Sequence, residues 1–133
     1  MGRNSAKILR NSEAKAIDLV AKILGAKIVE RNKGVFDWLR GDKDGKRNKG
    51  VKLRVDAWFP NKKLALEYNG IQHYKASKHM DRRTGRRLQR KKYDRRRQIL
   101  IPKHGINLMI IRYDEPLMED YIRVGLREMG YKV

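Results

Sequence analysis

The sequence contains no cysteine, few acidic residues and no long apolar run. The absence of cysteine excludes disulfide bonds, cysteine-based zinc fingers and thiol catalysis. No segment approaches the roughly 20 consecutive apolar residues that a membrane-spanning helix needs. We therefore expect a cytoplasmic protein that does not cross a membrane.

Basic residues outnumber acidic ones by 34 to 15 in a chain of 133 residues, so the formal net charge is +19. A charge this large on a small domain repels itself and favours binding to a polyanion. Nucleic acid is the leading candidate, because each phosphate that a Lys or Arg neutralises releases condensed counterions. An anionic membrane surface is the weaker alternative. The length fits a single domain with a real core.

The hydrophobic pattern predicts an α/β fold in which the elements follow the order helix, three strands, helix, strand, helix. Ser12 is expected to cap a first helix that ends near Gly25. Residues 1–11 would then form a basic N-terminal arm, and residues 12–133 a single domain. The later elements are expected as strands over 26–31 (extending irregularly toward Trp38), 51–59, 64–69 and 106–113, and as helices over 81–101 and from about Pro116.

Two of these elements have a predicted apolar face. Alternation places one set of residues of the second strand on a common face, with Asp56 and Trp58 on the opposite face. That set is Val51, Leu53, Val55, Ala57 and Phe59. In the last helix the expected apolar face is formed by Leu117, Tyr121, Val124, Leu126 and Met129.

The segment around Pro60 to Lys63 predicts a β-hairpin that brings two carboxylates together. If Phe59 pairs with Leu64, then Asp56 pairs with Glu67. Like charges that are directly opposed in an antiparallel pair repel each other. A divalent cation bound between the two carboxylates would remove that repulsion. The alternative is an exposed pair solvated by water and nearby lysines.

Asp56, ten intervening residues and the string Glu67-Tyr-Asn-Gly-Ile-Gln-His73 resemble the core of the PD-(D/E)XK nuclease superfamily. The string, the basic helix with Asp94 and the strand that ends at Arg112 are similar to a branch near very-short-patch repair endonucleases, phage homing endonucleases and Holliday-junction resolvases. The likeness covers residues 12–114. It implies a restriction-endonuclease-like core with a central mixed sheet flanked by helices, located in the host cytoplasm if a phage encodes it.

The resemblance also implies a metal site. Asp56, Glu67 and the Tyr68 backbone carbonyl would hold Mg²⁺, for which Mn²⁺ could substitute. Glu13 matches an additional acid of the superfamily that acts through water or a second ion. The simpler interpretation of Glu13 is that its charge complements the helix dipole.

The superfamily's usual Lys, two positions after the second acid, is replaced by Asn69. Three interpretations remain open: Gln72 or His73 takes over its role, a Lys or Arg from another element or a partner subunit reaches in, or the site is inactive. His73 has a suitable pKa for a general base, although a lone His after a strand is otherwise an ordinary surface residue. Asp94 matches an acid of the related branch, or it forms an ion pair within its helix with Arg90 or Arg97.

The segment 82–97 contains ten Arg or Lys residues, more than solubility requires, and predicts a phosphate-binding surface. The N-terminal arm and the Gly-rich loop 40–50 are expected to extend it. The predicted DNA-binding residues are Arg3, Arg10, Lys46, Arg47, Lys49, Arg82, Arg83, Arg86, Arg87, Arg90, Lys91, Lys92, Arg95, Arg96 and Arg97.

The expected function is a Mg²⁺-dependent DNA endonuclease. The small size and diffuse Arg distribution favour a structure-specific enzyme, such as a Holliday-junction resolvase that acts as a homodimer. Tyr121, Met129 and Tyr131 could form the dimer interface, with the intramolecular core as their alternative use. A sequence-specific homing or restriction enzyme, a mismatch-nicking enzyme and a noncatalytic basic nucleic-acid-binding protein are the competing hypotheses.

Overall fold

The structure, a computed structural model, describes residues 2–43, 49–70 and 84–133, and the side chains of all of these except 2–10, 84 and 86. The predicted order of helices and strands is confirmed. The elements are α1 (Gly2–Leu24), β1 (Glu30–Lys33), β2 (Val55–Phe59), a short 3-10 helix η1 (Pro60–Lys62), β3 (Leu64–Asn69), α3 (Thr84–Lys103), β4 (Asn107–Arg112) and α4 (Glu119–Glu128).

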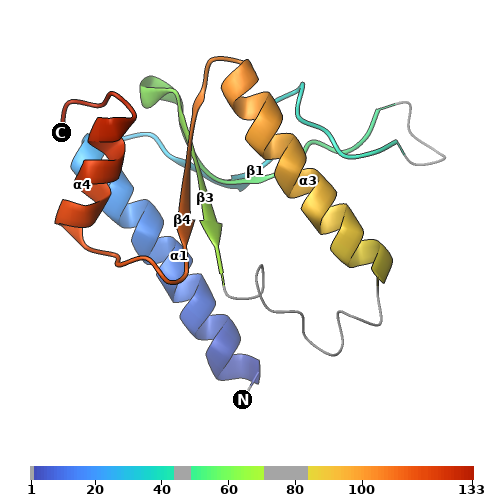
Figure 1. The fold of residues 1–133 in the computed structure, drawn as a ribbon, viewed down its shortest axis with the longest axis horizontal. Coiled ribbons are helices and arrows are strands. Elements are labelled where there is room, and N and C mark those ends of the chain that lie inside the picture. The colour runs from blue at the N-terminus through green and yellow to red at the C-terminus, as the bar shows by residue number, and fades with distance from the viewer. Residues whose placement is uncertain (1, 44–48, 71–83) are drawn as a thin grey trace.

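The four strands form one mixed sheet in the order β1-β2-β3-β4. β1 and β2 are antiparallel, as are β2 and β3, whereas β3 and β4 are parallel. Helices α1 and α4 pack on one face of the sheet and α3 on the other, as Figure 1 shows. The chain is therefore an α/β protein with a mixed sheet between two helical layers.

Each face of the sheet has its own apolar core. The first core lies under α1 and α4, where Ile17 and Ile122 pack against Phe59 and Met109. The second core lies under α3, where Ile101 packs with Ala65 and with residues of the segment between β1 and β2. The two faces of β3 thus contact different helices, and the sheet is buried on both sides.

The hairpin has the predicted register. Phe59 pairs with Leu64, and Ala57 pairs with Leu66. The connection is tight because Pro60 starts the 3-10 turn and Lys63 adopts a left-handed conformation with φ of 48°. This turn fixes which residues of β2 and β3 face one another.

The predicted start of the first helix is wrong. Ser12 lies inside α1, which begins at Gly2. Residues 6–10 are helix-favouring, and no Gly or Pro separates them from Ser12, so the helix continues toward the N-terminus. The predicted stop is confirmed: α1 ends at Leu24, and Gly25 has the left-handed φ of 63° that favours glycine.

The predicted face of the second strand is partly wrong. Ala57 and Phe59 belong to the first core, but Leu53 and Val55 belong to the second, and Val51 is 57% exposed. Val51 and Leu53 lie before β2, which begins at Val55, and β2 pairs with β3 only from Ala57 to Phe59. The first strand is also shorter than predicted and begins at Glu30.

The predicted apolar face of the last helix needs a similar correction. Helix α4 begins at Glu119 and buries Ile122 and Leu126, which lie one turn apart. Tyr121 and Val124 are 45% and 52% exposed. The prediction is confirmed for Leu126, Leu117 and Met129, which belong to the first core or pack against it, and is wrong for Tyr121 and Val124.

Other boundaries differ by small amounts. Helix α3 continues through Pro102 to Lys103, and its predicted beginning over 81–83 lies outside the described residues. β4 is shorter by one residue at each end than predicted. No helix in the described parts of the chain is both long enough and apolar enough to cross a membrane.

Two isoleucines of α3 test the position of the second core. Ile101 is fully buried, whereas Ile99 is 54% exposed. Ile101→Ala is expected to lower the free energy of unfolding by about 2–5 kcal/mol, because it leaves a cavity. Ile99→Ala should change it by less than about 0.5 kcal/mol. Urea denaturation of both variants measures the difference, and equal losses would contradict the packing of α3 described above.

Candidate active site

β2 stops pairing with β3 at the position of Asp56. The ladder of Cα partners ends with Ala57 and Leu66. Beyond it, the Tyr68 backbone N–H donates to Asp56 Oδ2 at 2.7 Å. A carboxylate oxygen thus replaces the backbone acceptor that a continued antiparallel strand would supply. This exchange fixes the Asp56 side chain between the two strands.

Three acidic side chains meet at this point, and we call Glu13, Asp56 and Glu67 the acidic cluster. Glu13 comes from α1, Asp56 from β2 and Glu67 from β3. The Asp56 carboxyl forms side-chain hydrogen bonds with both glutamates. The structure therefore brings together the three acids that the sequence singled out.

The acidic cluster shifts the pKa of both glutamates upward. Burial, followed by the charge of Asp56, raises the pKa of Glu67 to about 9, although Arg97 acts in the opposite direction. Burial and a hydrogen bond with Asp56 raise the pKa of Glu13 to about 7. Carboxyls that are desolvated and crowded by another carboxyl retain protons unless a cation replaces them.

Glu67 has an oxygen that is available for a cation. Its Oε1 atom is buried and has no hydrogen-bond partner among the described residues. Arg97 Nε lies 3.8 Å from this oxygen, too far for a hydrogen bond. A buried oxygen acceptor without a donor is uncommon in folded proteins and fits a site for an ion or an ordered water.

The backbone hydrogen bonds of β3 indicate the direction of the Tyr68 carbonyl. The backbone N–H groups of Asn107 and Tyr113 in and after β4 donate to the carbonyls of Lys63 and Asn69. Carbonyls alternate along a strand, so that of Tyr68 points away from β4, toward Asp56. Two carboxylates and a carbonyl suit Mg²⁺, which binds few protein oxygens and keeps several waters. In the described parts of the chain, no group of three or more acidic or histidine side chains is arranged to hold a metal ion.

Arg97, which the sequence predicted as a DNA-binding residue and as a possible partner of Asp94, also approaches the acidic cluster. It donates to Asp94 Oδ1 at 3.0 Å and to the Arg54 carbonyl at 2.9 Å, and it lies 3.8 Å from Glu67 Oε1. The alternative interpretation of Asp94, an ion pair within its helix, is confirmed for Arg97. Their spacing of three residues predicted that ion pair, but nothing in the sequence predicted the approach to Glu67.

Asn69 lies beside the same group of side chains. It is half-buried, and it lines a small pocket with Glu67, Asp94, Arg97 and Gln98. Gln98 is another neighbour that the sequence analysis missed. Gln72 and His73 lie outside the described residues, so their roles stay predictions.

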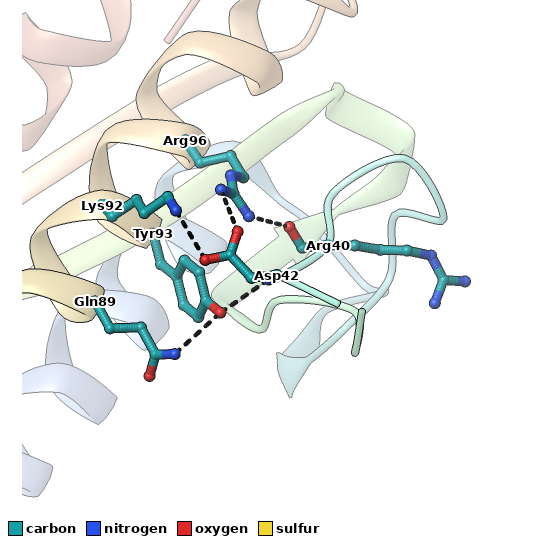
Figure 2. Close-up of polar contacts among 6 residues, drawn as sticks. All are labelled: Arg40, Asp42, Gln89, Lys92, Tyr93 and Arg96. Carbon is teal, nitrogen blue, oxygen red and sulfur yellow. Dashed lines mark hydrogen bonds and ion pairs between the residues drawn. The ribbon is translucent and has the colours of Figure 1, made fainter. Parts of the chain in front are cut away.

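A second polar network attaches the segment before the Gly-rich loop to α3 (Figure 2). Asp42 accepts hydrogen bonds from Lys92 Nζ at 2.8 Å and Arg96 at 2.9 Å. Arg96 also donates to the Arg40 carbonyl at 2.8 Å, and the Tyr93 hydroxyl accepts the Asp42 backbone N–H at 2.9 Å. Gly41 is required here, since a Cβ atom would lie 2.8 Å from the Tyr93 hydroxyl.

The cations of α3 differ in exposure. Arg96 and Arg97 are partly buried and donate hydrogen bonds within the chain: Arg96 to Asp42 and the Arg40 carbonyl, Arg97 to Asp94 and the Arg54 carbonyl. Lys92 is exposed but paired with Asp42. The remaining described candidates with exposed side chains are Lys49, Arg87, Arg90, Lys91 and Arg95.

The other predicted phosphate ligands are not placed by the structure. The backbone of three of them lies in helices, but their side chains are not described: Arg3, Arg10 and Arg86. Four lie outside the described residues altogether: Lys46, Arg47, Arg82 and Arg83. Their contacts with DNA stay predictions.

The pKa shifts predict how the metal-free protein responds to pH. Glu67 and Glu13 have raised pKa values, so the folded state binds more protons than the unfolded state between their ordinary and raised pKa values. Stability in EDTA should therefore be greatest near pH 4.5 and fall as the pH rises toward 9. The loss of melting temperature between pH 4.5 and pH 9 should be smaller in Glu67→Gln than in the unaltered chain, by at least about 3 °C. Scanning fluorimetry across that pH range measures it. An identical decline in the variant would contradict the shift at Glu67.

No known protein family and no solved structure matches the chain. The chain is similar to the uncharacterized protein 307L of Invertebrate iridescent virus 6, with 26% identity over 100 residues. The match covers 75% of this chain and 51% of the viral protein, so the chain spans about half the length of that relative. The function must accordingly be argued from the acidic cluster and its surroundings.

Proposed function

We propose that the chain is a Mg²⁺-dependent DNA endonuclease with a restriction-endonuclease-like core of the PD-(D/E)XK type. One observation carries this proposal: acids from α1, β2 and β3 converge where β2 leaves β3. The convergence occurs in a chain whose net charge is +19. Acids beside a phosphate-binding surface weaken binding unless a cation neutralises them, so a metal gives the cluster a function.

The residues of the cluster have different capacities to hold the ion. Asp56 already uses Oδ2 to accept the Tyr68 N–H, which leaves Oδ1 as its available ligand atom. Glu67 offers the unpartnered Oε1, and Tyr68 offers its carbonyl. Glu13 completes the set through water. When bound, the ion supplies charge stabilisation at the scissile phosphate and a lowered pKa of bound water.

Arg97 fits the second interpretation of the missing Lys, in which a Lys or Arg from another element reaches into the site. It reaches the cluster from α3 and is held there by Asp94 and the Arg54 carbonyl. A guanidinium stays protonated at neutral pH, so it would orient and stabilise phosphate oxygens rather than accept a proton. Proton transfer then falls to another group, for which His73 and Gln72 remain the predicted candidates.

The exposed cations of α3 would hold the DNA beside the acidic cluster. Arg87, Lys91 and Arg95 follow one another at intervals of four residues and so lie along one side of the helix. Such a row tracks a phosphate backbone and reads no bases. This pattern favours branched DNA, such as a four-way junction, over a defined duplex sequence. We propose that a homodimer acts on it, because two cuts require two sites.

A noncatalytic DNA-binding protein is the second candidate. The hydrogen bond from Tyr68 to Asp56 and the ion pair of Asp94 with Arg97 give these acids structural roles that need no metal. They leave the raised pKa values of both glutamates without a function. A cleavage assay separates the two candidates.

Asp56→Asn is the variant for that assay. Cutting of a synthetic four-way junction in Mg²⁺ should fall by more than about 100-fold, since even residues that only support a metal ligand cost about 10- to 100-fold. Binding of the junction should persist or strengthen, because one negative charge is lost. The Asn side-chain oxygen can still accept the Tyr68 N–H, so the fold should be retained.

The reference reactions are the unaltered chain with Mg²⁺, with Mn²⁺ and with EDTA, on junction and linear duplex. Undiminished cutting by Asp56→Asn would refute the assignment of the site. Absence of cutting by the unaltered chain on every DNA would favour the noncatalytic candidate. Cutting of one linear sequence alone would instead support the homing or restriction hypothesis.

Arg95 and Arg96 form a matched pair for the DNA-binding surface. Arg95 is exposed, whereas Arg96 is bound to Asp42 and the Arg40 carbonyl. Arg95→Gln should reduce the slope of log binding constant against log salt concentration by about 1, because one phosphate contact is lost. Arg96→Gln should leave this slope unchanged. Fluorescence anisotropy measures the slopes of both variants in the Asp56→Asn background, with Asp56→Asn alone as the reference. Equal slopes for these three proteins would contradict the proposed surface.

A further inference from the structure

The outer edge of β4 is open in the described structure. β4 is the last strand of the sheet, and among the described residues no strand pairs with its outer edge. The N–H groups of Asn107 and Tyr113 point toward β3. Backbone groups alternate along a strand, so those of Leu108 and Ile110 point outward. Long unprotected edges invite pairing with another strand, and proteins usually cover or charge them.

One end of this edge is already closed. Glu115 Oε2 accepts the Arg112 backbone N–H at 2.6 Å, and Glu115 Oε1 accepts the Tyr121 hydroxyl at 2.9 Å. Glu115 therefore acts as a stop that limits any added strand to the part of β4 before Arg112. The pairing groups that stay available are those of Leu108 and Ile110.

The open edge borders an apolar groove. The groove has a volume of about 410 Å³ and runs between β4 and α4, with Met109, Ile111, Tyr121 and Val124 among its lining residues. α4 lies on the same face of the sheet as α1, next to β4, as Figure 1 shows. Tyr121 and Val124 are 45% and 52% exposed here, on the side of α4 away from the first core.

The charge distribution favours a second copy of this chain as the occupant. α3 carries nine Lys or Arg and one Asp, a net charge of +8, so two α3 surfaces would repel each other. α4 carries two Arg and three acids, a net charge of −1, with both signs interspersed. A strongly basic molecule can contact its own copy at α4 without that repulsion, while its α3 surfaces stay available for DNA.

We propose that two copies of the chain dimerise through β4 and α4. The two β4 strands pair antiparallel about a two-fold axis at Met109, with Leu108 of one copy opposite Ile110 of the partner subunit. The sheets of both copies join into one continuous sheet. Val124 and Tyr121 of each copy cover the groove of the other copy. The pairing itself does not depend on the proposed nuclease function, but it would supply the two sites that junction cutting needs.

Sedimentation equilibrium of the whole chain tests the dimer. The unaltered chain should be dimeric, and Val124→Glu should weaken the dimer at least 100-fold, because it buries a charge in the groove. Ile99→Glu is the matched control: Ile99 has a similar exposure on α3, so this variant should dimerise as the unaltered chain does. Circular dichroism checks that all three proteins are folded.

A cross-link tests the register. The chain has no cysteine, so Met109→Cys introduces a single thiol. Across the axis, Cα atoms of a non-hydrogen-bonded antiparallel pair lie about 4.5 Å apart, within the range that a disulfide spans. Mild oxidation should therefore yield a covalent dimer of Met109→Cys and none of Ile99→Cys.

Three results would overturn the proposal. The first is an unaltered chain that stays monomeric at about 100 μM. At that concentration, a dimer with a dissociation constant near 10 μM would be the main species. The second is a dimer that survives Val124→Glu or that Ile99→Glu disrupts equally. The third is a cross-link at Ile99 in place of Met109. Cleavage is not the readout in any of these, so failure of the dimer and failure of the nuclease are distinguishable.

Discussion

The acidic cluster depends on one exchange of hydrogen-bond partners, in which the Asp56 carboxylate accepts the Tyr68 N–H. This exchange ends the pairing of β2 with β3 and opens the sheet at that point. Glu67 lies on the α3 face of β3, and Glu13 comes from α1 on the opposite face. Both form hydrogen bonds with the Asp56 carboxyl, at the point where the two strands separate.

The sequence predicted the parts of this arrangement that local rules determine. The turn at Pro60 and the alternation of β3 set the hairpin register, which is confirmed from Phe59 and Leu64 to Ala57 and Leu66. The predicted strand pairing of Asp56 with Glu67 is wrong, because the ladder ends before Asp56, and the two carboxyls meet through a side-chain hydrogen bond instead. Two features escaped prediction because they depend on contacts between distant segments. Arg97 meets Glu67 across 30 positions of the chain, and Asp42 meets Arg96 across 54. The sequence pattern also did not predict that Val55 and Ala57 belong to different cores.

Charge is distributed unevenly over this fold, with a net charge of +8 on α3 and −1 on α4. Asp42 neutralises part of the inner side of α3 and attaches the segment before the Gly-rich loop to that helix. The cations that stay exposed therefore lie on the outer side, where a polyanion can approach. α4 carries a nearly balanced charge on the opposite layer of the sheet. One molecule can accordingly offer one surface to a phosphate backbone and another to its own copy.

The same abundance of cations makes the acidic cluster informative. A chain with 34 Lys and Arg could neutralise three acids easily, yet the described structure brings only Arg97 near Glu67, at 3.8 Å and shared with Asp94. Glu67 Oε1 stays without a hydrogen bond among the described residues, and the Glu67 pKa rises to about 9. A buried carboxyl left in this state reduces stability. A dication would satisfy the free oxygen and displace the protons together, whereas another arginine would fill the place that a scissile phosphate needs.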